Sequence, residues 1–204
     1  LFSIHNMVRA VSDGKSQFKA EYWSPSQGSR AMREVINGAT ALGKASPITK
    51  PIGVHISDGC TIYNNEVLFA LRERGSLIIL VPVRCGVQRR LSQLSFMTVE
   101  RIMKHHTSIG VVGGVPNRSY YIIGTSGQRF AYLDPHVQTQ PAMLNEDTQR
   151  VTFETPGTVP LVGWDRVDTS LLFGFYVRNL DDYNSLSTEL CKINDDGFGD
   201  KLIY

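Results

Sequence analysis

Apolar residues in the first half of the chain include a set with helical spacing, whereas in the second half they form mainly short runs. The first pattern is typical of amphipathic helices and the second of β-strands. Phe96, Val99 and Met103 follow the helical spacing and predict a helix that ends near His105. We therefore expect most helices in the first half and most strands in the second.

Further helices are predicted from start and stop signals. Ser24, Pro25 and Gln27 have the pattern of an N-cap, a first helical proline and a capping box, so a helix should run over residues 25–37 and stop at Gly38. A second helix should end at Gly75, and a last one, behind an acidic start, should pack on the sheet through Tyr183, Leu186, Leu190 and Ile193.

Short apolar runs predict the strands of one sheet. The run at 76–83 is continuous and rich in β-branched residues, which is typical of a central strand buried on both faces, and Pro82 should mark where its pairing stops. The runs at 120–124 and 129–134 should form a hairpin. Residues 145–165 are expected to form a long polar loop. Other strands are expected at residues 52–56, 108–112 and 171–177.

This order of elements indicates an α+β fold, with an antiparallel sheet mainly in the second half. A length of 204 residues fits a single domain over residues 1–204. The chain begins at Leu1, without an initiator methionine and already within an apolar-patterned segment. We therefore expect the domain to be incomplete at its N-terminus and the chain to be part of a longer polypeptide.

Charge and cysteine content argue against several classes of protein. With 21 basic and 19 acidic residues, the chain has no excess charge that would favour nucleic acid or an anionic membrane. Three widely spaced cysteines without a C-x-x-C pair argue against a disulfide framework and structural zinc. No apolar run approaches the ~20 residues that span a bilayer. We expect a soluble protein of the cytoplasm.

An acid, a proline and a histidine follow one another at the end of the strand expected at 129–134. Asp134 and His136 project on the same face of an extended chain, with side-chain bases ~6.5 Å apart, and Pro135 favours extended geometry for the residue before it. A carboxylate on one imidazole nitrogen leaves the other nitrogen free to activate a nucleophile. A plain turn is the alternative, since Asp-Pro is a common turn signal.

Among the chemistries that could use this pair, the sequence favours that of a thiol. A metal would need more ligands than these two, and the chain has no H-x-H, H-E-x-x-H or G-x-S-x-G pattern. Cys85 follows the central strand and Cys191 lies inside the last helix, so Cys60 is the one plausible nucleophile among the three, with an ordinary loop thiol as its alternative. We also consider a nucleophile upstream of Leu1.

Residues 113–117 read Gly-Gly-Val-Pro-Asn, a strand ending in glycine follows, and then come Leu-Asp-Pro-His and Thr-Gln-Pro. In this order and spacing the chain resembles the autophagins, papain-like cysteine proteases that process the ubiquitin-like autophagy modifier. The segments at 1–16, 77–86 and 171–186 extend the resemblance over most of the chain. It implies a papain-like α+β fold. Proteases of the ubiquitin-fold modifier share Asp-Pro-His and are the alternative.

The resemblance assigns roles to individual residues. Asp134 and His136 match the catalytic pair of the family. Gly114, Pro116 and Asn117 match a mobile loop that covers the family's nucleophile until the tail of the modifier enters. By itself, such a glycine-rich stretch is more often only a loop between strands.

An aromatic cover over the groove is also implied, and the sequence departs from the family elsewhere. Tyr22 stands at the place of the covering tryptophan, with Trp23 beside it, and core packing is the alternative role for these rings. The family's Gly-Trp-Gly-Cys segment and its oxyanion-hole tyrosine are absent, so the nucleophile is expected upstream of Leu1 and this chain alone should be inactive. One extra residue follows His136 relative to the family's spacing.

The implied activity is that of a cysteine endopeptidase. It would cleave after the C-terminal glycine of the modifier, both in the precursor and in the conjugate with phosphatidylethanolamine, without a metal or organic cofactor. Contact with a membrane surface would come only through the lipidated substrate, and no nucleic acid is implied. A non-catalytic modifier-binding homologue is a further alternative.

The segment at 181–186 has the form of a short motif that docks on the autophagy modifier, with an acid, an aromatic and an aliphatic residue. Such motifs bind in an extended conformation. Tyr183 and Leu186 also belong to the helical stripe of the last helix, so we predict that they pack in the core.

Overall fold

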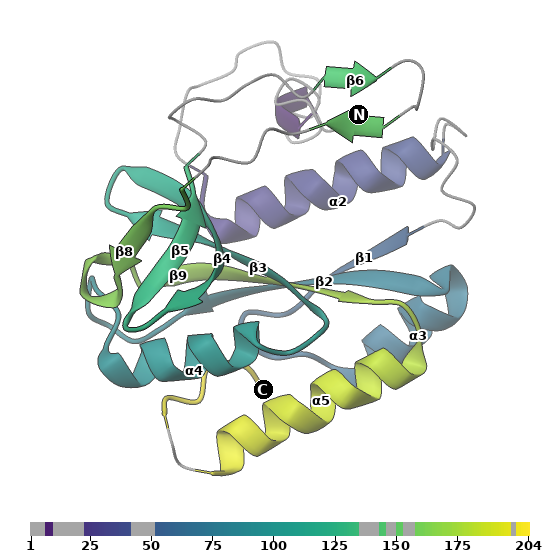
Figure 1. The fold of residues 1–204 in the computed structure, drawn as a ribbon. Coiled ribbons are helices and arrows are strands. Elements are labelled where there is room, and N and C mark those ends of the chain that lie inside the picture. Colours follow the sequence, from purple (N-terminus) through teal and green to yellow (C-terminus); the bar gives the residue numbers. More distant parts are fainter. Residues whose placement is uncertain are drawn as a thin grey trace.

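The computed structural model describes residues 7–9, 23–41, 52–134, 143–145, 150–152, 158–196 and 199–204. A seven-stranded sheet in the order β1-β2-β9-β3-β4-β5-β8 forms its centre (Figure 1). Its strands are β1 (Ile52–Ile56), β2 (Ser76–Arg84), β3 (Ser108–Val115), β4 (Arg118–Ser126), β5 (Arg129–Leu133), β8 (Leu161–Gly163) and β9 (Ser170–Val177). The helices are α2 (Pro25–Ala41), α3 (Asn64–Arg74), α4 (Gln93–Met103) and α5 (Leu180–Asp195), with the 3-10 turn η1 (Trp164–Arg166).

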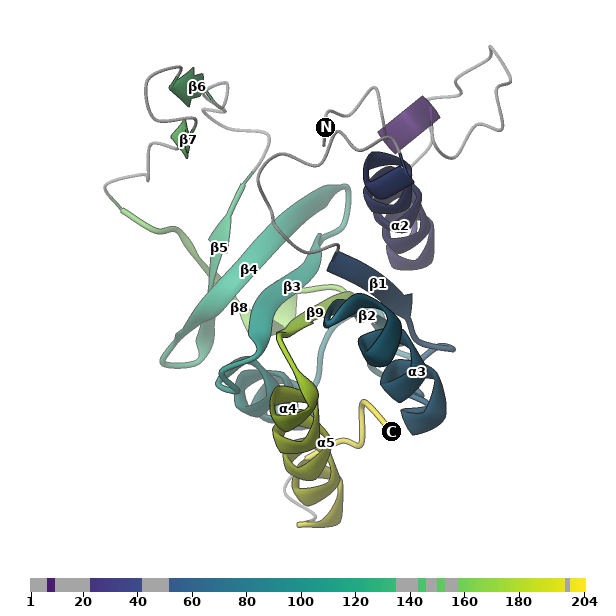
Figure 2. The ribbon, with the colours of Figure 1, turned by 90° about the vertical axis from the view of Figure 1, so that its right-hand side faces the viewer.

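Helices cover both faces of this sheet. The helix α2 lies over β1, β2 and β9 on one face, while α3, α4 and α5 lie along the other (Figures 1 and 2). The pair β1–β2 is parallel, and the other pairs in the sheet are antiparallel. The predicted α+β fold, with helices mainly in the first half and antiparallel strands in the second, is therefore confirmed.

The predicted start of α2 is correct, but its predicted end is wrong. The backbone N–H of Gln27 donates to Ser24 Oγ at 3.3 Å, and the N–H of Ser24 donates to Gln27 Oε1 at 2.8 Å, which is a reciprocal capping box. The helix does not stop at Gly38 but continues to Ala41. A glycine inside a helix costs only about 1 kcal/mol relative to alanine, and Gly38 does not adopt the positive φ of a helix-ending glycine.

The other predicted helices are confirmed. At the end of α3, Gly75 has φ of 79° and its N–H donates to the carbonyl of Leu71, as expected of a glycine stop. The helix α4 ends at Met103, just before His105. Ser92 caps its start, since its side chain accepts a hydrogen bond from the N–H of Ser95.

The last helix packs its predicted stripe into the core. Tyr183 and Leu186 on α5 are only 3% and 1% exposed. Core packing is therefore confirmed for these two residues, and the motif-like segment at 181–186 is not an extended docking motif in this structure. Core residues from the sheet include Phe130, Phe173 and Phe175, each at most 1% exposed.

The strand β2 is buried as predicted, but its pairing does not stop at Pro82. It lies between β1 and β9, and its register with β9 continues through Pro82 to Arg84. The carbonyl of Leu80 accepts a bond from Ser57 just beyond β1, so the backbone of Pro82, two residues on, faces the same side, where β1 has already ended. The missing N–H of the proline therefore removes no bond from the ladder.

Residues 145–165 are not one long polar loop. Leu161–Gly163 form β8, which pairs with β5 at the edge of the sheet, and Val162 is buried in the core. Arg150–Thr152 form β7, paired with β6 (Met143–Asn145) in a separate two-stranded sheet. Strands of three residues are too short to show an alternation in the sequence, which is why the pattern missed them.

In the described part of the chain, no helix is both long and apolar enough to cross a membrane.

Candidate functional site

Asp134 is the first residue after β5, and it is partly buried. The strand β5 pairs with β4, so the predicted hairpin of these two strands is confirmed. Pro135 and His136 lie outside the described residues, so the expected contact between Asp134 and the imidazole stays a prediction.

The sheet register places Asp134 close to the glycine-rich segment. Gly113 in β3 pairs with Tyr120 in β4, and Tyr121 in β4 pairs with Leu133 in β5. Continuing this register by one residue puts Asp134 opposite Tyr120, two strands from Gly113. Because neighbouring strands lie about 4.8 Å apart, the backbones of Gly113 and Asp134 are separated by about 10 Å. The structure therefore brings the Gly-Gly-Val-Pro-Asn segment and Asp134 to the same end of the sheet.

Residues 113–117 are not a loop throughout. Gly113, Gly114 and Val115 complete β3, and only Pro116 and Asn117 form the turn into β4. Asn117 has φ of 68°, the left-handed value that the third position of a type II turn requires after a proline. The segment is thus the closed end of a β-hairpin with both turn residues exposed. Its assigned role in covering a nucleophile stays a prediction.

Gly114 is required by this hairpin. Its φ is 150°, and a Cβ built at this position would overlap the backbone carbonyl oxygen of Arg118. Any other residue would push the two strands of the hairpin apart. In the sequence, Gly114 stands out only by its place in the motif, because the clash with Arg118 cannot be seen without the register.

Trp23 lies two residues before the start of α2 and is partly buried. Tyr22 lies outside the described residues. The covering role of these two rings, with core packing as its alternative, stays a prediction.

Two tyrosine rings lie beside the position of Asp134. The rings of Tyr120 and Tyr132 are stacked, with centroids 4.1 Å apart and an interplanar angle of 24°. Tyr120 is buried in the core at 6% exposure. Burial raises the pKa of Tyr132, with further contributions from Tyr120 and from the charge of Asp134, while the charge of Arg118 opposes them. The Tyr132 phenol is therefore neutral at physiological pH.

None of the three cysteines has the environment of an activated nucleophile. Burial and the charge of Asp200 raise the pKa of Cys85 to about 12, so this thiol is inert near neutral pH. Cys191 is exposed near the end of α5. Cys60 lies in a turn ahead of α3, which begins only at Asn64, so it is not at a helix N-terminus. This position fits the ordinary loop thiol better than the nucleophile.

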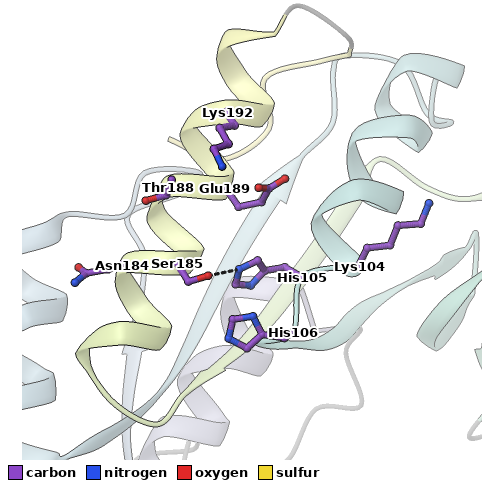
Figure 3. Close-up of a pocket in the computed structure, with 8 residues that line it drawn as sticks. All are labelled: Lys104, His105, His106, Asn184, Ser185, Thr188, Glu189 and Lys192. Carbon is purple, nitrogen blue, oxygen red and sulfur yellow. Dashed lines mark hydrogen bonds between the residues drawn. The ribbon is translucent and has the colours of Figure 1, made fainter.

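A second cluster of polar side chains, which the sequence analysis did not identify, lines an open cavity of about 550 Å³ (Figure 3). The rings of His105 and His106 are in contact, with centroids 4.4 Å apart and a tilt of 41° between their planes. Its Nε2 lies 3.1 Å from Ser185 Oγ and its Nδ1 lies 2.8 Å from Thr107 Oγ1. Burial, followed by the charge of His106, lowers the pKa of His105. The cavity lies between the end of α4 and the outer face of α5, lined by Lys104, His105, His106, Asn184, Ser185, Thr188, Glu189 and Lys192.

Asp182 joins this cluster to the start of α5. Its carboxylate accepts bonds from Arg178 Nε at 2.7 Å and Nη2 at 2.9 Å, and it lies 3.3 Å from His106 Nε2. The side chain of Asp182 is 8% exposed. Hydrogen bonding to Arg178 holds the pKa of Asp182 well below the usual carboxyl range. The contacts are therefore those of a structural ion pair.

Replacing Asp182 by asparagine in the complete protein should lower the free energy of unfolding by about 2 kcal/mol at neutral pH, because a charged acceptor of hydrogen bonds is lost. The folded-state pKa lies below the unfolded value, so this contribution is full above about pH 4 and disappears as the pH falls further. Urea unfolding between pH 3 and pH 7 measures the difference between the two proteins, which should begin to shrink below about pH 4.

Asp181→Asn is the matched control, because Asp181 is exposed and carries the same charge in the same first turn of α5. Its replacement should change stability by less than about 0.5 kcal/mol. Equal losses in the two variants would show that Asp182 acts only through the helix dipole and would contradict the role of Arg178.

The described residues contain no group of three or more histidines, cysteines or acids that could hold a metal ion.

Comparison with known proteins identifies relatives of most of the chain. A family model described as the peptidase C54 catalytic domain matches residues 1–189. The cysteine protease ATG4C of Homo sapiens is 29% identical over 204 residues, covering 95% of this chain and 42% of the relative. ATG4C of Xenopus laevis is 27% identical over 196 residues, covering 94% and 42%. The cysteine protease ATG4 of Candida albicans is 26% identical over 197 residues, covering 95% and 43%. The chain thus spans less than half the length of these relatives.

Proposed function

Because this chain belongs to the peptidase C54 family of cysteine proteases, the autophagins, we propose that the protein containing it cleaves after the C-terminal glycine of a ubiquitin-like autophagy modifier. The observation that carries the proposal is the placement of Asp134. It follows β5, the second strand of a hairpin whose first strand, β4, begins directly after the turn at Pro116 and Asn117. Two motifs that are 17 residues apart in the sequence, at Asn117 and Asp134, thereby come to one end of the sheet.

The proposed mechanism uses three groups. A cysteine upstream of Leu1 is the nucleophile, His136 is the general base and acid, and Asp134 orients the imidazole. The thiolate attacks the carbonyl carbon of the glycine, and the imidazolium of His136 transfers its proton to the leaving amine as the amide bond breaks. His136 then takes a proton from water, the resulting hydroxide attacks the thioester, and the thiolate is released.

The same chemistry accounts for two substrates. In the precursor the leaving group is the amine of the next amino acid, and in the lipid conjugate it is the amine of phosphatidylethanolamine. Both are amides of the same glycine carbonyl, so one site serves maturation and delipidation. The protein would work in the cytoplasm, and it would contact a membrane surface transiently, through the lipidated substrate.

We further propose that the turn at Pro116, with Gly114 and Asn117 beside it, and the aromatic cover at Tyr22 and Trp23 restrict the tail channel to glycine. Replacing the C-terminal glycine of the precursor by leucine should lower kcat/KM at least about 100-fold, because a side chain has no room beneath the turn and the cover. Cleavage of a precursor–reporter fusion by the complete protein measures the effect. Efficient cleavage of the leucine substrate would contradict a glycine-only channel.

The ubiquitin-fold modifier gives the control for substrate class, because its proteases use the same Asp-Pro-His chemistry. The complete protein should release the reporter from the autophagy modifier and leave the same fusion of the ubiquitin-fold modifier intact. Preferential cleavage of the second fusion would refute the proposed substrate. Binding without cleavage of either fusion would indicate a non-catalytic homologue.

A further inference from the structure

The stacked rings of Tyr120 and Tyr132 lie on the face of the hairpin to which Asp134 belongs. Tyr132 precedes Asp134 by two residues, so in extended backbone their side chains project from the same face, with bases about 6.5 Å apart. Tyr120 and Ile122, which alternate with Tyr121, are buried, whereas Tyr121 is 42% exposed on the opposite face. Tyr132 pairs with Ile122 and therefore shares the buried face.

The ladder of β5 ends directly before Asp134. Its last pair with β4 is Leu133 with Tyr121, and its last pair with β8 is Ala131 with Leu161. The N–H of Tyr132 still donates to the carbonyl of Pro160 at 3.1 Å. Backbone hydrogen bonds thus hold β5 as far as Tyr132, which belongs to the tyrosine stack and precedes Asp134 by two residues.

The buried ring of Tyr120 anchors the stack, and the charge of Asp134 acts on the Tyr132 phenol. Tyr120 is 6% exposed, and its ring lies 4.1 Å from that of Tyr132. The charges of Asp134 and Arg118 act on the Tyr132 phenol with opposite signs, so both groups lie within electrostatic range of its hydroxyl. A flat ring held against a buried one has little freedom to rotate, and this restricts the strand end that carries Asp134.

We propose that Tyr132, held by the ring of Tyr120, is a positioning residue that fixes the direction of the Asp134 carboxylate toward His136. The proposal rests on the proposed function, in which Asp134 orients the imidazole. A carboxylate displaced by 1 Å can lower a catalytic rate by up to about 100-fold, so a fixed strand end matters for turnover. The stacked ring carries most of the effect, and the hydrogen bond between the Tyr132 and Tyr120 side chains adds to it.

The test compares Tyr132→Phe, which keeps the ring, with Tyr132→Leu, which removes it, in the complete protein acting on a modifier–reporter fusion. Tyr132→Phe should retain at least about half of kcat. Tyr132→Leu should lower kcat about tenfold with KM changed less than about twofold, because only the orientation of the catalytic groups is lost. It should also move the alkaline limb of the pH profile to lower pH, because a well-placed carboxylate favours the imidazolium.

Tyr121→Leu is the matched control on the opposite face of β4, and it should change neither kcat nor the pH profile. If Tyr132→Leu has normal kcat, or loses activity only in proportion to the folded fraction with an unmoved alkaline limb, the positioning role is wrong.

A readout without turnover separates this proposal from the proposed function. The titration midpoint of His136, followed by NMR of labelled histidine and assigned with His136→Gln, should fall in Tyr132→Leu and stay unchanged in Tyr132→Phe and Tyr121→Leu. An unchanged midpoint in Tyr132→Leu would overturn the positioning role. Absence of modifier cleavage by the wild-type protein would instead overturn the proposed function, and the midpoint would still decide whether Tyr132 positions Asp134.

Discussion

Replacing His136 by alanine in the complete protein should lower kcat/KM for a modifier–reporter fusion by about 1,000-fold or more. The imidazole is the group that forms the thiolate, protonates the leaving amine and activates water in the proposed mechanism. Its loss therefore removes all three proton transfers at once. Initial rates of reporter release, measured with excess enzyme for the variant, give the ratio of kcat/KM between the wild-type protein and the variant.

Two further variants test whether the loss of activity is specific to the proposed catalytic pair. Asp134→Asn should keep the fold and lower kcat by about 100-fold or more, because the amide no longer holds the imidazole in the required tautomer. His105→Ala, in the cavity between α4 and α5, should leave kcat/KM within about twofold, because none of the proposed catalytic residues lines that cavity. Retained turnover in His136→Ala would refute the assigned role of this residue.

Gly114→Ala should lower the free energy of unfolding by about 3 kcal/mol, because the new Cβ meets the carbonyl oxygen of Arg118 and the backbone is in a conformation that alanine avoids. The strain lies in the hairpin that ends in Pro116 and Asn117, so the turn should shift as well. Cleavage of the modifier fusion should therefore fall more than the folded fraction does. Urea unfolding and reporter release by the complete protein measure the two effects.

Gly124→Ala is the matched control, because Gly124 lies in β4, the other strand of the same hairpin. A Cβ at Gly124 would meet no atom within 4 Å, and its backbone is not in the left-handed region. This variant should change stability by less than about 1 kcal/mol and leave cleavage intact. Equal stability of the two variants would contradict the strain assigned to Gly114.

The sequence predicted those parts of the fold that depend on local chemistry. The capping box of Ser24 and Gln27 and the glycine stop at Gly75 involve neighbours in the chain, and both are confirmed. The predicted end of α2 was wrong because a glycine can either stop a helix or lie within it, and the helix continues past Gly38. The prediction that pairing stops at Pro82 was wrong for a different reason. Whether a proline interrupts the pairing depends on where the neighbouring strand β1 ends.

The candidate site could be predicted only in part. Asp134 was found from its motif, and the structure adds the register that places it near Gly113. The stack of Tyr120 and Tyr132 and the clash at Gly114 depend on pairs of residues on different strands, which no periodicity encodes. The cluster of His105 with Ser185 joins residues 80 positions apart in the sequence, so adjacent histidines were the only signal for it.

Our central proposal is that this chain supplies the acid–base half of a cysteine peptidase whose nucleophile lies upstream of Leu1. Its most direct test is mass spectrometry of the complete, native protein after exposure to an autophagy modifier with a thiol-reactive group at its C-terminal glycine. The account predicts a single adduct, on a cysteine upstream of Leu1, that fails to form with a modifier lacking its tail. An adduct on Cys60, or tight binding without any adduct, would contradict it.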